Sequence, residues 1–241
     1  MKQLVIVLLG FMLIAPFAQA TTLSADNGED NLSFNKFESR SPLSITQNVD
    51  PYAMDTYPPR CLDLDSEFTL HNWFLRRFVL AEHGSPPMVD VQSVDFAIWE
   101  CSTDGFSIDL VLFTIATGDD FIFANMTEIA RETISVGVSD SGSYINVPIL
   151  GTVDSGYDLV VAIEAPDGNP TGTVFLPGGS RGGWVFREGY LACIGTGEEP
   201  MTNSEIAGPI FEPHQLIFIV NGDTSNVPTA TMTFSNVKSL Y

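Results

Sequence analysis

The chain has 241 residues, with 30 Asp and Glu against 10 Lys and Arg, and a formal net charge of −20 at pH 7. A field of that sign repels phosphate backbones and anionic lipid, so the composition excludes nucleic-acid binding more strongly than any other function class. Abundant carboxylates keep a protein soluble and offer oxygen ligands to divalent cations such as Ca²⁺.

Residues 1–20, MKQLVIVLLGFMLIAPFAQA, have the form of a secretory signal peptide. Lys2 supplies a positive charge, residues 4–14 form an apolar run too short to span a bilayer comfortably, and AQA is a small-x-small cleavage pattern. We therefore predict cleavage after Ala20 and secretion to the extracellular space or the periplasm. We expect no integral membrane segment after cleavage. An uncleaved anchor is the alternative interpretation.

In the remainder of the chain, the composition and the hydrophobic pattern change at Cys61. Residues 21–60 are polar and acidic without sustained periodicity, which predicts a disordered or loosely attached acidic arm. From Cys61 to residue 222, short runs rich in Val, Ile and aromatic residues alternate with Gly, Asp, Asn and Pro. About eight such runs, each bounded by turn signals, are typical of a β-sandwich or jelly roll. We predict an all-β fold, with a single antiparallel, jelly-roll-like β-sandwich over 61–222.

The C-terminal tail, residues 223–241, contains the alternating run TATMTFSNV. We interpret this run as an edge strand. A secretion tail and a strand donated to a neighbouring protomer are the alternatives, and the last of these leaves the oligomeric state open.

Two adjacent arginines lie inside the apolar run HNWFLRRFVL, residues 71–80. An arginine in a central strand must be paired or must extend to an edge. We predict that Arg76 forms a structural ion pair with a strand carboxylate, with Asp95 or Asp109 as the partner. An anion-binding role for Arg76 and Arg77 is the functional alternative.

The three cysteines are Cys61, Cys101 and Cys193. In an oxidising compartment two of them are expected to pair, and one is then left over. No CxxC motif is present, so the sequence indicates neither a zinc ribbon nor a redox motif.

Five segments carry a family resemblance: HNWFLRRFVL, VQSVDFAIW, INVPILGTVDSGYDLVVAIEAPDG, GGSRGGWVFREGYLACIGTGEEP and FEPHQLIFIVNG. They resemble a jelly-roll-like β-sandwich domain of secreted bacterial proteins, which occurs alone or appended to exported hydrolases. The resemblance covers most of the mature chain and implies an extracellular module without catalytic residues. It also implies a disulfide between Cys61 and Cys193, which leaves Cys101 free and buried. A Cys101–Cys193 bridge is the alternative.

The clearest match to a catalytic motif is weak. Residues 178–182, GGSRG, fit the GxSxG pattern of a nucleophile elbow, but that motif needs a following helix, and the strand-like WVF follows here. We interpret Ser180 as part of a flexible loop and predict that the protein is not an enzyme. A secreted hydrolase is an alternative. His71, His83 and His214 show no metal-binding spacing.

Two kinds of ligand are suggested by residue type. A structural Ca²⁺ near the ends of the sandwich would use Asp63, Asp65 or Asp223, and solvated carboxylates are the alternative. No cofactor other than this calcium is expected.

Trp184, Tyr190 and Arg181 lie in or after a Gly-rich loop, where aromatic rings can stack on sugars. We assign Trp73 and Trp99 to the core. The sequence predicts a secreted, non-catalytic module that binds a glycan or another cell-surface partner, and a self-assembling, adhesin-like subunit is the main alternative.

Overall fold

The strands of the protein follow the alternating runs of its sequence. The computed structural model describes residues 40–84, 88–181, 189–193, 197–208 and 214–225. Within them the strands are β1 Arg40–Thr46, β2 Asn72–Phe78, β3 Met88–Cys101, β4 Phe106–Ala116, β5 Met126–Val136, β6 Ser143–Asp154, β7 Tyr157–Ala165, β8 Phe175–Pro177, β9 Gly179–Ser180, β10 Tyr190–Cys193, β11 Met201–Thr202, β12 Gln215–Leu216 and β13 Phe218–Ser225.

The helices in these ranges are short. They are the 3₁₀ turns η1 Leu80–His83, η2 Phe123–Asn125, η3 Val138–Asp140 and η4 Asn169–Thr171, and the single helix α1 Asn203–Ala207. None of them is both long enough and apolar enough to cross a membrane. All described residues belong to one compact unit.

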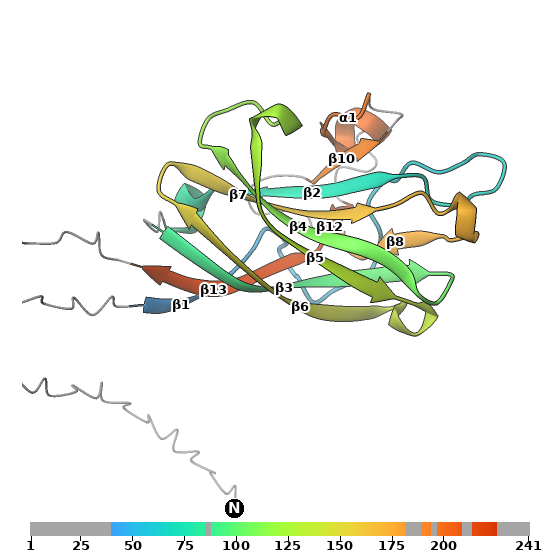
Figure 1. The fold of residues 1–241 in the computed structure, drawn as a ribbon, viewed down its shortest axis with the longest axis horizontal. Helices are drawn as coiled ribbons and strands as arrows, with labels where there is room; N and C mark the ends of the chain where they lie inside the picture. The colour runs from blue at the N-terminus through green and yellow to red at the C-terminus, as the bar shows by residue number, and fades with distance from the viewer. Residues whose placement is uncertain (1–39, 85–87, 182–188, 194–196, 209–213, 226–241) are drawn as a thin grey trace, which may run out of the picture. The chain divides into compact units, whose positions relative to one another are not determined.

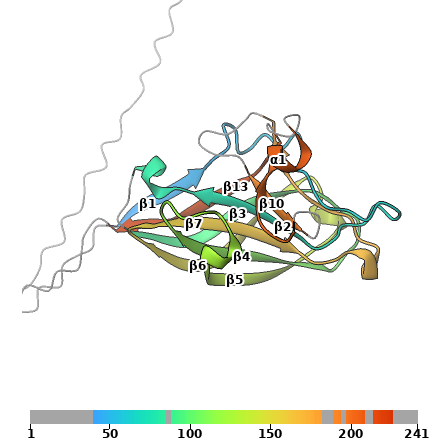
Figure 2. The same cartoon turned by 90° about the horizontal axis from the view of Figure 1, so that it is seen from above.

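Two antiparallel sheets form the layers of a sandwich (Figures 1 and 2). One has the order β1-β13-β3-β6, with β8 also paired to β3, and the other has the order β11-β10-β2-β7-β4-β5. We call them the five-stranded and the six-stranded sheet; a separate ladder joins β9 and β12. The predicted all-β sandwich is confirmed, with thirteen strands in place of about eight. Strands of two or three residues are too short to show periodicity.

The main core lies between the two sheets. Phe74, Phe78 and Leu110 of the six-stranded sheet meet Phe96 and Phe218 of the five-stranded sheet, and all five side chains are buried. Burying one such side chain contributes about 1.5–3 kcal/mol, so this interior is the main source of stability.

The sandwich begins earlier and ends later than the sequence predicted. β1 lies inside the predicted acidic arm, and it pairs with β13 from Arg40↔Ser225 to Thr46↔Ile219. Gln47 and Asn48 are buried directly after it. Residues 40–60 therefore belong to the sandwich. β13 is an inner strand that extends beyond residue 222, while the predicted signal peptide and the TATMTFSNV run lie outside the described residues.

Arg76 lies in the core without the predicted carboxylate. Its side chain is fully buried; Nε donates to Oε1 of Gln47 at 3.1 Å, and Nη1 donates to the Leu216 carbonyl at 2.8 Å. The predicted pair with Asp95 is wrong, because Asp95 lies on the other sheet and accepts hydrogen bonds from two asparagine side chains of neighbouring strands. The arm residues that follow β1 thus supply polar partners to the buried guanidinium.

The disulfide joins Cys61 to Cys193, as the family resemblance implied. The bridged residues are 132 positions apart, and closing so long a loop stabilises the fold by about 4 kcal/mol in the entropic account. The Asn72 side chain bonds both backbone groups of Cys61, at 2.8 and 3.0 Å. Cys101 is a buried free thiol, and burial raises its pKa.

Candidate ligand-binding site

The six-stranded sheet carries a second apolar cluster on the face turned away from the main core. Its buried members are Leu75, Val111, Phe113, Ile115, Val160, Ala162 and Ala192. Four aromatic side chains pack against them: Trp73, Phe121, Phe123 and Tyr190. The connection between β4 and β5, residues 117–125, supplies the two phenylalanines. This outer face is therefore covered by aromatic groups rather than left as a plain solvated surface.

A buried ion pair fixes this connection to the sheet. Nη2 of Arg77 lies 2.7 Å from Oδ2 of Asp158, and the two side chains are only 8% and 2% exposed. Nη1 of Arg77 donates to the Asp119 carbonyl at 2.9 Å. The same guanidinium lies 6.0 Å from the centroid of the Phe121 ring. Arg77 therefore holds the segment that carries the aromatic cover.

A cavity of about 350 Å³ lies beside the aromatic cluster. Its described lining residues are His71, Trp73, Phe123, Ala192, Cys193 and Glu198. The Trp73 and Phe123 rings meet edge to face with 5.4 Å between centroids. A second cavity of about 380 Å³, between β5 and β6, has no aromatic residue among its described lining. Ligand sites are mostly apolar with a few placed polar groups, so the first cavity is the stronger candidate.

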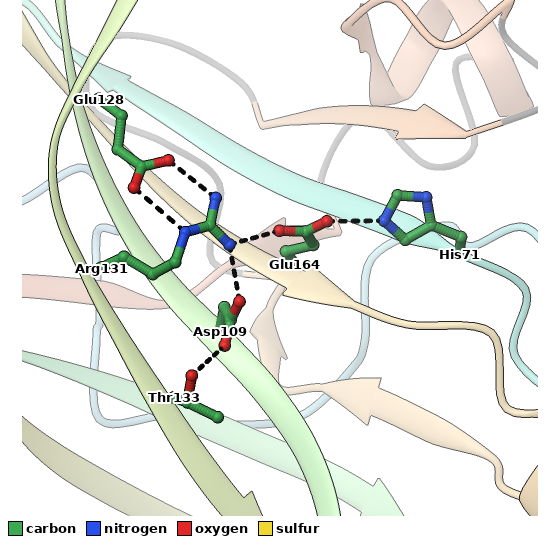
Figure 3. Close-up of polar contacts among 6 residues, drawn as sticks. All are labelled: His71, Asp109, Glu128, Arg131, Thr133 and Glu164. Atoms are coloured by element: carbon green, nitrogen blue, oxygen red, sulfur yellow. Dashed lines mark hydrogen bonds and ion pairs between the residues drawn. The ribbon is translucent and has the colours of Figure 1, made fainter.

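A charged cluster is centred on Arg131 (Figure 3), and it includes His71 of the cavity lining. Nη1 of Arg131 lies 2.6 Å from Oδ2 of Asp109 and 2.6 Å from Oε2 of Glu164. Its Nε and Nη2 donate to the two oxygens of Glu128 at 3.1 and 2.8 Å. The other oxygen of Glu164 contacts Nε2 of His71 at 2.9 Å. Because an ionised carboxylate can only accept, this His71 nitrogen carries a hydrogen.

The strand register explains why these groups meet. Asp109 of β4 lies directly opposite Glu164 of β7 on one side and Thr133 of β5 on the other. Arg131 is two residues from Thr133, on the same face of the sheet. Two carboxylates placed opposite each other repel, and the arginine on the adjoining strand compensates for that repulsion. Thr133 also donates to Asp109 at 2.7 Å.

The charged cluster reaches the cavity through Trp73. The guanidinium carbon of Arg131 lies 5.7 Å from the centroid of the Trp73 ring, which is cation–π distance. Hydrogen bonding to Arg131 lowers the pKa of the Glu128 carboxyl, and hydrogen bonds to the carboxylates, that of Glu128 first, raise the pKa of Arg131. Glu128 and Arg131 are therefore charged and hold each other in place beside the indole.

Glu198 brings a further carboxylate to the cavity wall. Its φ is +69°, in the left-handed region that residues other than glycine rarely adopt. The Glu198 amide donates to the Cys193 carbonyl at 2.9 Å. The side chain of Glu199 accepts from the Phe123 amide at 3.1 Å, which ties this turn to the β4–β5 connection. The wall is thus assembled from separate segments that are bonded to one another.

Of the two predicted ligand residues that the structure describes, Tyr190 is found in this region and Arg181 is not. The Tyr190 ring packs on Phe121 with 4.1 Å between centroids, at the start of β10. Arg181 is exposed, is absent from the cavity lining, and its amide donates to Oδ1 of Asp55 at 2.7 Å. Trp184 lies outside the described residues.

The predicted calcium ligands are not brought together. Oδ1 of Asp63 accepts from the amides of Asp65 and Ser66 at 2.8 and 3.1 Å, which lowers the pKa of Asp63. Asp223 accepts from Gln92 at 2.8 Å. Among the residues that the structure describes, no group of three His, Cys, Asp or Glu side chains is placed to hold a metal ion.

Ser180 is a buried strand residue. It pairs with Gln215 in the β9–β12 ladder and is 1% exposed, whereas a nucleophile elbow presents its serine on a sharp exposed turn. The predicted flexible loop is wrong for residues 178–180. A Cβ added to Gly178 would lie 2.5 Å from the Cβ of Ala97, so close packing, and not mobility, requires glycine there.

Sequence reasoning missed most of this site. It assigned Trp73 to the core, but the indole packs on the outer face and lines the cavity. Arg131 meets carboxylates 22 and 33 positions away in the chain, and no local motif marks such contacts. The available signal was the alternation in β2, which puts Trp73 on the face of Arg77, opposite Phe74.

No protein-family model and no curated protein matches the chain. One solved structure similar to it holds the cysteine protease and lectin-like domains of Cwp84, a surface layer associated protein of Clostridium difficile; the TM-score is 0.45 and the identity 17%, over 65% of this chain and 33% of that chain. Another is a clostridial Cwp84 cysteine protease after propeptide cleavage, with a TM-score of 0.44 and 14% identity over 77% of this chain and 40% of that chain. The chain therefore spans less than half of either structure. Similarity this low supports no conclusion about function.

Proposed function

We propose that the protein is a secreted, non-catalytic β-sandwich module that binds carbohydrate at the cavity beside Trp73. One observation carries the proposal: an aromatic-walled cavity of about 350 Å³ borders a fixed cluster of charged hydrogen-bonding groups. The form of residues 1–20 supports an extracellular location.

The chemistry of the cavity suits a sugar ring. The apolar face of a sugar packs on an aromatic side chain, and Trp73 and Phe123 offer such surfaces in the wall. Sugar hydroxyls both donate and accept, so they match carboxylates and ring nitrogens such as those of Glu198 and His71. Groups that are already held in place lose little conformational entropy on binding.

The charged cluster is better suited to binding than to acid–base catalysis. A carboxyl that acts as a general acid at neutral pH needs a raised pKa. Contact with Arg131 shifts the pKa of Glu128 in the opposite direction. Glu164 and Asp109 also have both oxygens engaged with neighbouring side chains. These contacts fix the carboxylates in place, and each oxygen keeps a second lone pair with which it can accept.

A glycan array and a polysaccharide pull-down on the purified protein test the proposal, with one arm in calcium and one in EDTA. We expect specific binding that Trp73→Ala abolishes and Trp73→Phe weakens. Trp99→Phe is the matched control, because Trp99 packs against Tyr57 and is absent from the described cavity lining. Loss of binding in EDTA would reveal a calcium requirement.

Three results would count against this site. If the folded protein binds none of the glycans on the array, carbohydrate binding is contradicted. Binding that Trp184→Ala abolishes and Trp73→Ala leaves intact moves the site to the Gly-rich loop. Turnover of a bound polysaccharide, abolished by substituting a single carboxylate, would identify a hydrolase.

A self-assembling structural subunit is the second candidate, favoured by the strand edges. Among the described strands, β6 pairs only with β3 and β5 only with β4, and the cavity of about 380 Å³ lies between them. An extended segment of a second copy, such as TATMTFSNV, can add to an edge of this kind. This candidate predicts large assemblies by light scattering that disappear on truncation after Ser225. A monomer at all concentrations contradicts it.

A further inference from the structure

We infer that the ligand of this cavity carries a positive charge, and that the module selects amino sugars with a free ammonium group over their neutral N-acetyl forms. The inference rests on the proposed carbohydrate site. It goes further by naming the class of sugar.

In the charged cluster beside the cavity, carboxylates outnumber arginines. Asp109, Glu128 and Glu164 all contact Arg131, and among the described residues their side chains contact no other Arg or Lys. With the three carboxylates ionised, one arginine leaves the cluster at 1 − 3 = −2. The remaining negative charge attracts a cation from solution.

A further carboxylate lies in the cavity wall itself. Glu198 lines the cavity beside Trp73 and contacts no Arg or Lys among the described residues. Its left-handed backbone, held by the bond to the Cys193 carbonyl, sets the direction in which its side chain leaves the wall. An acidic group in an aromatic cavity can accept hydrogen bonds from an ammonium group.

The aromatic wall reinforces this charge preference. The face of an indole ring attracts cations through its quadrupole. The guanidinium of Arg131 lies 5.7 Å from the Trp73 ring, and the three carboxylates that contact Arg131 offset its repulsion of a second cation. A neutral sugar gains only stacking and hydrogen bonds here, while an ammonium sugar adds Coulombic attraction to the carboxylates. Uronic or sialic acids would be repelled by the same groups. The −20 charge of the whole chain acts in the same direction and makes this attraction sensitive to salt.

The test is a pair of calorimetric titrations of the purified protein with two hexasaccharides of identical backbone. One is the glucosamine hexamer and the other is the N-acetylglucosamine hexamer, both near pH 6, where an ordinary amine is protonated. We expect the ammonium form to bind about tenfold tighter or better, which corresponds to one favourable charge contact of about 1.4 kcal/mol. Most of that advantage should disappear at about 0.5 M salt.

Two isosteric variants distinguish the effect of the carboxylate in the cavity wall from the effect of the net charge of the protein. Glu198→Gln should reduce the preference for the ammonium form severalfold without changing the melting temperature. Asp223→Asn removes the same charge from the five-stranded sheet and should leave the preference unchanged. Equal losses in the two variants would overturn the inference, because they would show that only the overall charge attracts the ligand.

The outcomes distinguish the inference from the proposed function. Equal affinity for the two hexamers, weakened alike by Trp73→Phe, would keep the carbohydrate site and overturn the charge preference. Failure of the folded protein to bind either hexamer or any glycan on the array would overturn both.

Discussion

The outer faces of the two sheets are built from different side chains. On the five-stranded sheet, short polar groups bond across strands: Ser44 to Asn221 at 2.9 Å, and Asn221 and Asn146 to Asp95 at 2.8 and 2.6 Å. On the six-stranded sheet, aromatic rings and a cluster of three carboxylates around Arg131 lie beside a cavity. The first face satisfies its own hydrogen bonds. The second keeps carboxylates in excess beside an apolar wall, and that combination favours a ligand.

The adjacent arginines of β2 show the same difference. Arg76 points into the core, where a glutamine side chain and a backbone carbonyl accept two of its hydrogen bonds. Arg77 points to the outer face and pairs with the carboxylate of Asp158. The strand alternation therefore separates a structural cation from one that anchors the aromatic cover of the site.

Breaking the buried ion pair between Arg77 and Asp158 should have the largest effect on stability. Asp158→Asn leaves the guanidinium of Arg77 buried without its counter-charge, and we expect a loss of about 3–5 kcal/mol in the free energy of unfolding. The melting temperature should fall by roughly 10 °C. On the other sheet, Asp95→Asn should cost about 1 kcal/mol at most. Urea unfolding measures both, and equal losses would contradict the difference drawn between the two faces.

Removing the disulfide should rank next. The double variant Cys61→Ser with Cys193→Ser should lose about 2–4 kcal/mol of stability, because the unfolded chain regains the entropy of a long loop. Cys193 also lines the cavity, so we expect glycan affinity to fall in this variant even where it is folded. Affinity equal to that of the wild type would show that the bridge does not shape the wall.

Replacing the indole should affect binding more than stability. Trp73→Phe keeps an aromatic ring in the wall but gives up stacking area, and we expect glycan affinity to drop about tenfold or more. Trp99→Phe should leave affinity unchanged. Titration calorimetry compares the two, and matching losses would mean that neither tryptophan marks the site.

The smallest expected effect is the loss of stability when Glu128 is protonated at low pH. Its pKa is lowered in the folded protein, so its pair with Arg131 stabilises the fold above the unfolded pKa and ceases to do so as the pH falls through the lowered value. Because Glu128 is 43% exposed, we expect less than about 1 kcal/mol. Glu128→Gln should be slightly less stable than the wild type at pH 7 and equal to it in acid. A stability difference between the variant and the wild type that grows as the pH falls would contradict the lowered pKa of Glu128.

The longer strands were predictable from periodicity, but one local irregularity was not. The runs 89–101 and 107–115 match β3 and β4 closely. In β3, a register shift between Val91 and Ser93 lets both Val91 and Val94 enter the core, although strict alternation would place these two residues on opposite faces. β1 was missed because its apolar alternation is limited to Leu43 and Ile45, and its pairing with β13 is non-local.

The site itself depends on contacts between strands that a single sequence does not show. Nothing near Arg131 in the chain indicates that Asp109 and Glu164 will lie beside it, because sheet register brings them together. The alternation in β2 puts Trp73 on the same side as Arg77, but the sequence did not show that this side faces away from the main core. Both faces of a central strand are apolar, so the pattern alone does not identify the inner one.

The central claim is that the outer face of the six-stranded sheet binds sugar, and hydrogen–deuterium exchange with and without a bound glycan tests it most directly. We predict slower exchange in residues 71–73, 121–126 and 190–193, and no change in residues 90–95 and 219–223 of the other sheet. Protection confined to the five-stranded sheet, or to residues outside both sets, would contradict the claim.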